Sequence, residues 1–142
     1  MKIKSVFGIS ILFTIIMILS TSCRKNRSVI PYVAVDKEIN ITLPGNFNLA
    51  VIGGWMYISG GSKGILVYRR QQDEFVAYDR HCPYNVDAGC VVEVDSSNIE
   101  IIDPCSGSKF SLYDGSATIG PATLPLKQYA TSFDGTNVRI YN

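Results

Sequence analysis

The sequence predicts an all-β domain, built as an antiparallel sandwich or barrel. Short runs rich in Val, Ile, Tyr and Phe alternate with turn signals made of Gly, Pro, Asn and Asp, which is typical of strands joined by tight connections. Beyond the N-terminal apolar run, no segment sustains a 3.6-residue apolar period over three turns, so α-helices are not expected. Both observations favour the all-β class.

The expected strands follow one another closely along the chain. They are 39–43, 48–52, 55–58, 65–70, 74–79, 91–94, 99–102, 109–113 and 138–141. Turn signals such as Pro44-Gly45-Asn46 and Gly53-Gly54 separate them. Because β-branched and aromatic runs bounded by such turns indicate strands, we expect neighbouring runs to pair antiparallel.

The first residues have the organisation of an export signal. Lys2 and Lys4 precede an apolar run over 6–19, which is shorter than the roughly 20 residues that a membrane span needs. The run leads through small residues to Cys23, and this pattern resembles a bacterial lipobox. The resemblance implies that Cys23 becomes an acylated N-terminus. The alternatives are an uncleaved anchor or a plain secretory signal with an incidental cysteine.

This interpretation divides the chain into three parts. We expect a lipoprotein signal peptide at 1–22, a tether at 23–37 and the β domain at 38–142. The anchor implies a bacterial cell envelope, with the membrane contacted through the lipid on Cys23. Arg24 stands where an aspartate marks inner-membrane retention in some bacteria, so we expect an outer-membrane anchor that faces the periplasm.

Composition argues against several classes of function. The 142-residue chain has a net charge of +1 and no basic stripe, so nucleic acid is not an expected partner. No Ser-His-Asp set, paired carboxylates or phosphate-binding loop is visible, and the chain has one histidine. We therefore expect no catalytic residues and no enzyme activity.

Three cysteines follow Cys23, namely Cys82, Cys90 and Cys105. Disulfides persist in the compartments to which exported proteins are sent, so one bridge is expected. Three thiols allow three pairings, and these residues alone do not choose among them.

Residues 77–128 resemble the Rieske iron–sulfur domain. "AYDRHCPY" is similar to the first ligand box of that family, normally Cys-x-His, and "DPCSGSKF" is similar to the second, normally Cys-Pro-Cys-His-Gly-Ser-x-Phe. "DGSATIGPATLPLKQY" resembles the family's later loop and closing strand. The resemblance implies a Rieske-like antiparallel sandwich or barrel with a small loop subdomain at residues 80–121.

The resemblance also locates the positions that would hold iron. Cys82 matches a cysteine ligand, but Tyr84 replaces a histidine, Asp103 replaces a cysteine and Ser106 replaces a histidine. A Rieske cluster needs two thiolates on one iron and two imidazoles on the other. We therefore expect no metal and no cofactor, with a [2Fe–2S] cluster held by atypical ligands as the alternative.

The family's disulfide is implied where the ligands are lost. Cys105 aligns with the inner cysteine of the second box, and Cys90 matches its partner if 86–89 is an insertion. A bridge from Cys82 to Cys105 stays open as an alternative. His81 is interpreted as a strand-end residue, and Cys82 as a small buried residue rather than a reactive thiol.

Three hypotheses of function follow. The first is a lipid-anchored, cluster-free structural or binding module with an unknown envelope protein as partner. The second is electron transfer through a [2Fe–2S] cluster. The third is a mononuclear metal or thiol site at the loop tip, built from His81, Cys82, Tyr84, Asp103 and Ser106.

Overall fold

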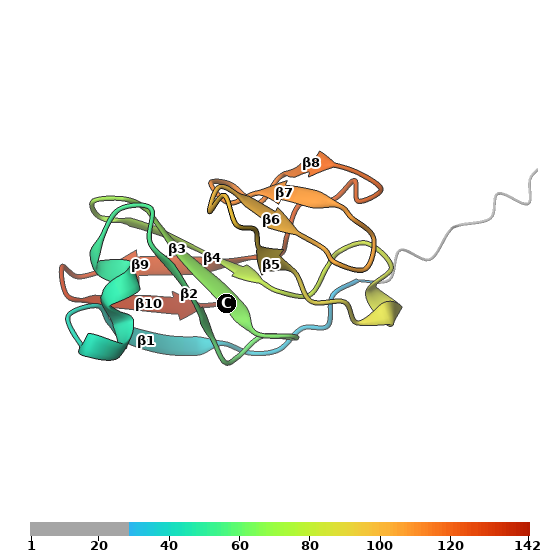
Figure 1. The fold of residues 1–142 in the computed structure, drawn as a ribbon. Helices are drawn as coiled ribbons and strands as arrows, with labels where there is room; N and C mark the ends of the chain where they lie inside the picture. Colours follow the sequence, from blue (N-terminus) through green and yellow to red (C-terminus); the bar gives the residue numbers. More distant parts are fainter. Residues whose placement is uncertain (1–28) are drawn as a thin grey trace, which may run out of the picture.

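The larger sheet has six antiparallel strands in the order β1-β10-β9-β4-β3-β2 (Figure 1). A computed structural model describes residues 29–142. The strands are β1 (Asp36–Asn40), β2 (Trp55–Ile58), β3 (Ile65–Gln71), β4 (Glu74–Asp79), β9 (Gln128–Phe133) and β10 (Asn137–Tyr141). Pairing of β1 with β10 and of β9 with β4 brings both ends of the described chain into one sheet.

A second antiparallel sheet is inserted between β4 and β9. Its four strands are β5 (Glu93–Val94), β6 (Glu100–Ile102), β7 (Lys109–Ser111) and β8 (Ala117–Ile119). It lies as a separate layer beside the larger sheet (Figure 1). The all-β prediction is therefore confirmed, with the small sheet inside the segment 80–121 expected to form a loop subdomain.

Strands β3 and β4 separate two hydrophobic cores. Successive side chains of a strand point to opposite faces of the sheet. Ile65 and Val67 accordingly join one core with β1 and β10, whereas Leu66 joins a second core that includes Phe110 of the small sheet. All four of these side chains are fully buried. The second core is what fixes the small sheet, and hence the loops between the sheets, against the larger one.

The expected strand at 48–52 was wrong. Pro44–Ala50 form a short 3-10 helix, η1, with a proline in its first turn, where the fixed φ of proline suits a helix start. Leu49 is buried, but Val51 and Ile52 are 61% and 58% exposed. The apolar run therefore lacks the alternate burial of a strand.

Three further elements differ from the expected ones. Strand β8 was not expected, the start of β9 was indicated only by the family resemblance, and β1 begins at Asp36, inside the segment expected to be a tether. Val35 is buried, and its backbone N–H donates to Asn142 Oδ1 over 2.9 Å, which ties the two ends of the domain together.

The signal peptide at 1–22 and the lipidation residue Cys23 lie outside the described residues, as does Arg24. Within 29–142, no helix has the length and apolar character that crossing a membrane requires.

Candidate functional site

The first loop of the site leaves the end of β4. His81 pairs with Val91 as an isolated antiparallel bridge, and the Cys82 backbone N–H donates to Cys90 O over 3.0 Å. Between these residues the chain forms a short 3-10 helix, η2 (Val86–Ala88). The loop is thus a closed hairpin with Cys82 and Cys90 opposite each other at its base.

The second loop connects β6 to β7. Asp103 N donates to Ser108 O and Gly107 N donates to Asp103 O, both over 2.8 Å, so the loop closes on itself. Gly107 has φ +74°, a left-handed conformation that glycine adopts without steric cost. Asp103 and Ser108 are buried at the base of this loop, whereas Cys105 is exposed.

Cys82 and Asp103 meet between the two loops. Cys82 is fully buried and Asp103 is 1% exposed. Burial is the main cause that raises the pKa of the Cys82 thiol to about 12; the backbone of Tyr84 lowers it, and the neighbouring Asp103 carboxyl raises it. The thiol is therefore protonated at neutral pH and lies beside the carboxyl.

Serine hydroxyls complete the surroundings of Asp103. Ser106 Oγ donates to Asp103 Oδ2 over 2.6 Å, and the Cys105 N–H donates to Asp103 Oδ1 over 3.1 Å. Ser106 Oγ also lies 2.8 Å from Ser108 Oγ, which accepts the Ala122 N–H over 3.0 Å. Asp103 thus lies beside two other predicted ligand positions: it contacts Cys82 and is hydrogen-bonded to Ser106.

Tyr84 stands apart from this group. Its side chain is 42% exposed, whereas its backbone lies beside the buried Cys82 thiol.

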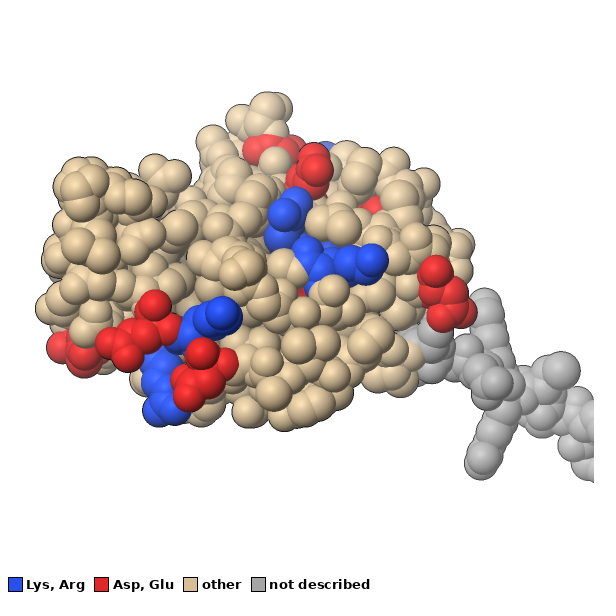
Figure 2. Space-filling model, turned by 90° about the horizontal axis from the view of Figure 1, so that it is seen from below, with Lys and Arg blue, Asp and Glu red and all other residues tan. Residues whose placement is uncertain are grey.

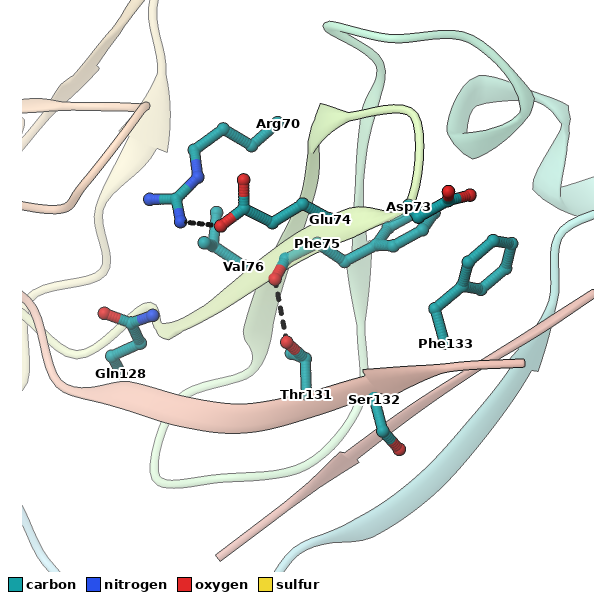
Figure 3. A pocket seen from close by; sticks show the side chains of 9 residues that line it. All are labelled: Arg70, Asp73, Glu74, Phe75, Val76, Gln128, Thr131, Ser132 and Phe133. Atoms are coloured by element: carbon teal, nitrogen blue, oxygen red, sulfur yellow. Dashed lines mark hydrogen bonds and ion pairs between the residues drawn. The ribbon is translucent and has the colours of Figure 1, made fainter. Parts of the chain in front are cut away.

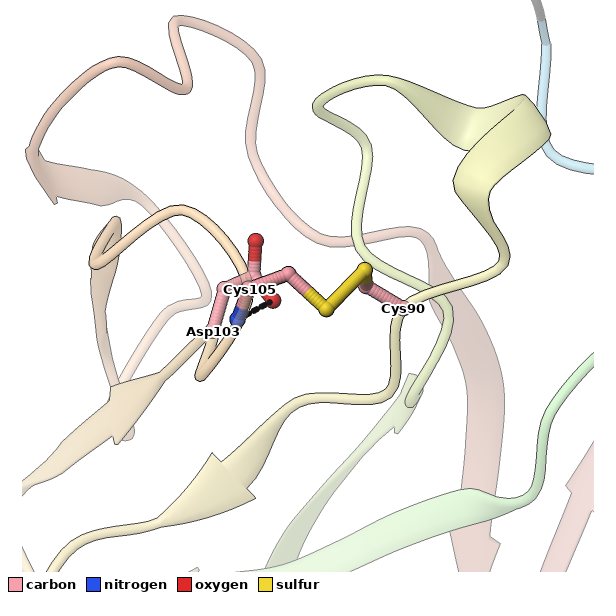
Figure 4. A group of neighbouring side chains, drawn as sticks. All are labelled: Cys90, Asp103 and Cys105. Carbon is pink, nitrogen blue, oxygen red and sulfur yellow. Dashed lines mark hydrogen bonds between the residues drawn. A yellow bond between two sulfur atoms is a disulfide. The ribbon is translucent and has the colours of Figure 1, made fainter.

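A disulfide joins the two loops. Cys90 and Cys105 are bonded, with their Cα atoms 6.2 Å apart and 15 residues between them in the sequence (Figure 4). This is the pairing that the family resemblance implies. Cys82 keeps a free, buried thiol, so the alternative bridge from Cys82 to Cys105 was wrong.

His81 has both ring nitrogens engaged. Nδ1 lies 2.9 Å from Ser62 Oγ, and Nε2 lies 2.8 Å from Val86 O. The residue is 4% exposed. A ring that holds η2 in this way is structural, as the sequence interpretation expected.

The sequence analysis missed Asp79, which organises the base of the first loop. Its fully buried carboxylate accepts from Tyr129 OH over 2.6 Å, from Ser62 N over 2.7 Å and from His81 N over 2.9 Å. Burial and the hydrogen bond to Asp79 raise the pKa of Tyr129. An acid at the end of a strongly apolar strand was the available signal, because such a group needs several donors.

An apolar groove, which we call the tip groove, lies beside the first loop. It has a volume of about 470 Å³, and its lining includes Val29, Tyr32, Pro83, Val86, Leu124 and Lys127. Val29, Tyr32 and Leu124 are 81%, 73% and 41% exposed. The start of the described chain therefore forms one wall of the groove.

Elsewhere the surface offers little chemistry. A hollow of about 290 Å³ between β4 and β9 contains Arg70 and Glu74, which form an ion pair, and the Phe75 carbonyl, which accepts from Thr131 (Figure 3). No histidine or cysteine lines this hollow. Figure 2 shows Lys and Arg side chains lying next to Asp and Glu side chains on one face, with no basic stripe on that face.

Comparison with solved structures identifies the fold. The plasma membrane Rieske protein PetC3 from Synechocystis PCC 6803 is similar with a TM-score of 0.57 and 23% identity, over 73% of this chain and 99% of that one. The ferredoxin of carbazole 1,9a-dioxygenase from Nocardioides aromaticivorans IC177 is similar with a TM-score of 0.50 and 19% identity, over 78% and 98% of the two chains. No protein-family model and no curated protein matches the sequence.

The fold and the loops define a class: a two-sheet β domain whose inserted small sheet carries two disulfide-linked loops. The chain carries a Rieske-like domain.

The residues of the two loops do not fit a Rieske [2Fe–2S] cluster. Such a cluster needs a second thiolate and two imidazoles besides Cys82. The sole histidine of the chain, His81, has both ring nitrogens bonded within the protein. Asp103 stands where the second thiolate is required, and its carboxyl accepts hydrogen bonds from Ser106 Oγ and the Cys105 N–H.

Proposed function

We propose that this protein is a lipid-anchored, Rieske-fold module that has lost its [2Fe–2S] cluster and serves as a non-catalytic structural or binding component of a bacterial envelope. The observation that carries the proposal is the buried contact between Cys82 and Asp103. In a Rieske protein the residues at these two positions would both bind one iron. Here their side chains lie next to each other in the interior, and this contact joins the two loops without metal.

The disulfide and the serine network support the same proposal. Cys90–Cys105 links the loops covalently, and Ser106 and Ser108 satisfy the remaining polar groups around Asp103. No buried side-chain nitrogen or oxygen atom of residues 80–110 lacks a hydrogen-bond partner, which favours loops that are stable without a metal.

Iron analysis tests the proposal directly. The full mature chain is purified under air, and iron, acid-labile sulfide and the visible spectrum are measured. We expect substoichiometric iron and no visible absorption. Two irons per chain with a Rieske spectrum would overturn the proposal and establish the alternative, electron transfer, which the similarity of fold alone favours.

The lipid anchor is tested separately. Cells expressing the protein are fed a labelled fatty acid, and the protein is also purified for mass spectrometry. We expect acylation at Cys23 and its loss in Cys23→Ser. An unmodified cysteine, or an intact segment 1–22, would overturn the anchor without affecting the cluster question.

We propose that the tip groove contacts the bilayer that holds the anchor. From Cys23 to Val29 the chain reaches at most about 20 Å, so the groove wall lies close to the acylated end. Tyr32 and Leu124 offer apolar surface of the kind that enters a membrane interface. Lys127 lines the groove, and the segment that precedes Val29 in the sequence carries Arg24, Lys25 and Arg27. These cationic side chains attract anionic headgroups.

Two single-cysteine labels test this contact. Leu124→Cys and Leu43→Cys each replace an exposed leucine, and Leu43 precedes η1, which lies at the end of the domain away from the start of the described chain (Figure 1). Each acylated variant carries an environment-sensitive dye and is placed in phosphatidylethanolamine–phosphatidylglycerol vesicles that contain a lipid-borne quencher. We expect quenching at position 124 and none at position 43. Equal quenching at the two positions would contradict the proposal.

A further inference from the structure

We propose that reduction of the Cys90–Cys105 disulfide converts the loop tip into a binding site for one zinc ion. The four ligands are the thiolates of Cys82, Cys90 and Cys105 and the carboxylate of Asp103. In the oxidised protein two of these ligands are bonded to each other, so the site exists only in the reduced state.

Three of the four ligand atoms are already close together. The Cys90 Sγ, the Cys105 Sγ and a carboxylate oxygen of Asp103 all lie within 4.8 Å of one another (Figure 4). In tetrahedral zinc sites, Zn–S is about 2.3 Å and Zn–O about 2.0–2.2 Å, which places neighbouring ligand atoms roughly 3.5–3.8 Å apart. Separation of the two sulfur atoms by a small side-chain rotation would therefore produce a zinc-sized cage.

Cys82 supplies the fourth ligand from inside. It lies opposite Cys90 at the base of the first loop, where its backbone N–H donates to Cys90 O over 3.0 Å. Its thiol lies near the Asp103 carboxyl, which contributes to the raised pKa of Cys82. The Cys82 sulfur is not among the three ligand atoms that lie within 4.8 Å of one another, so it completes the tetrahedron by moving toward them when zinc binds.

Asp103 is held in place by residues that would remain after reduction. Ser106 Oγ and the Cys105 N–H each donate to one of its two oxygens. Outer-shell hydrogen bonds of this kind orient metal ligands. Three thiolates with one carboxylate select zinc over Mg²⁺ and Ca²⁺, because the harder ions prefer oxygen ligands.

The disulfide is accessible to a reductant. Cys105 is exposed and Cys90 is half-buried. In the cell, a dithiol would give two thiols on the protein and be oxidised to its own disulfide. In the test, a water-soluble phosphine takes the oxygen of one water molecule, and the two sulfur atoms take its hydrogens. Each thiol that then binds zinc releases one proton.

The inference rests on the proposed function in one respect, because Cys82 must be free of an iron cluster. The iron analysis above decides that point independently. The zinc experiment uses protein already shown to hold no iron, so failure of one proposal is distinguishable from failure of the other.

The test compares the oxidised and reduced forms of the mature chain. After phosphine treatment and its anaerobic removal, Co²⁺ is titrated as a spectroscopic probe, and Zn²⁺ is added to displace it. We expect one Co²⁺ per reduced chain, with the absorption of tetrahedral thiolate coordination, and none per oxidised chain. Equal binding by both forms would overturn the proposal, as would absence of thiolate absorption in the reduced form.

Variants assign the ligands. Cys90→Ser/Cys105→Ser should abolish binding. Asp103→Asn should weaken it by about tenfold or more, because even outer-shell partners of metal ligands are worth 10–100-fold. Asp114→Asn is the matched control, since Asp114 is exposed and bonded only to its own turn. Retained binding in the double variant, or an equal loss in the control, would contradict the proposal.

A second measurement tests whether the reduced chain fails to bind metal only because it has unfolded. Zinc that binds only the folded state must raise the midpoint of thermal unfolding of the reduced chain. We expect stoichiometric Zn²⁺ to raise that midpoint for the reduced chain and to leave the oxidised chain unchanged. A reduced chain that is unfolded and not restored by zinc would count against the site.

Discussion

The thiol of Cys82 lies beside the carboxyl of Asp103 in the interior, although Cys82 follows β4 of the larger sheet and Asp103 follows β6 of the smaller one. By resemblance to Rieske domains, these are the two positions that would share one iron. A thiol–carboxyl contact needs no metal and closes the same gap. The pairing therefore explains how the two loops stay together with a single sulfur at the ligand positions.

This contact predicts a loss of stability in alkaline solution. The folded pKa of Cys82 is about 12, whereas an unfolded thiol ionises near 9.0. Between these values the unfolded state binds fewer protons than the folded state. The contribution of Cys82 to the free energy of unfolding is therefore fully present below about pH 9, and it falls as pH rises by up to about 1.4 kcal/mol per pH unit. Urea unfolding of wild type and Cys82→Ala at several pH values measures this slope.

The Cys82→Ala variant is the control for other groups that titrate in alkaline solution. Tyr78 and Tyr129 also have raised pKa values, so both proteins lose stability above pH 10. We expect the decline between pH 9 and 10 to be shallower in Cys82→Ala. Identical slopes in the two proteins would show that Cys82 is not protonated and buried as described.

The disulfide is expected to stabilise the domain by about 3 kcal/mol, because it closes a loop of 15 residues in the unfolded chain. Chemical denaturation of Cys90→Ser/Cys105→Ser should show this decrease in the free energy of unfolding. Adding a reductant to wild type should lower its stability, and adding it to the double variant should change nothing. A double variant as stable as wild type would contradict the expectation.

Two buried tyrosines offer a matched pair of substitutions. Tyr129 OH donates to Asp79 over 2.6 Å, whereas Tyr78 OH is buried without a hydrogen-bond partner within the described residues. We expect Tyr129→Phe to destabilise the fold by about 1–3 kcal/mol, because the buried Asp79 carboxylate loses a donor. Tyr78→Phe should be neutral or slightly stabilising, because it removes an unpaired polar atom.

Thermal and urea unfolding of the two variants decide the comparison. Each substitution removes one oxygen from a buried ring in the same sheet, so the difference between them isolates the hydrogen bond to Asp79. Equal destabilisation would contradict the assigned network.

Local sequence patterns predicted the strands whose own residues have a strong apolar pattern. The runs expected at 65–70 and 74–79 became β3 and β4, because apolar side chains on both faces can be buried by two cores. Local patterns missed strand β9, whose start only the family resemblance indicated, because Thr131 and Ser132 carry no strong apolar alternation. It is a strand through its pairing with β4 and β10, which local sequence does not reveal.

The site was predictable in position but not in its bonding. The family resemblance indicated Cys82, Asp103 and Ser106 as neighbours, and the structure brings them together. The network around Asp79 was not predictable, because its donors Ser62 and Tyr129 come from distant segments. Only the closed sheet places these groups within reach of one another.

Restoring the ligands tests whether the rest of the loop tip can still hold a cluster. The variant Tyr84→His/Asp103→Cys/Ser106→His supplies two thiolates, with Cys82, and two imidazoles. The side chain at 103 already contacts Cys82, so the new thiol would lie beside the old one.

After anaerobic reconstitution with iron and sulfide, we expect the triple variant to show visible absorption and two irons per chain, because it alone has a complete Rieske ligand set. The double variant Tyr84→His/Ser106→His is the control and should stay colourless, since it lacks the second thiolate. A colourless but folded triple variant would mean that the loop backbones, and not only the four side chains, have diverged from a cluster-binding geometry.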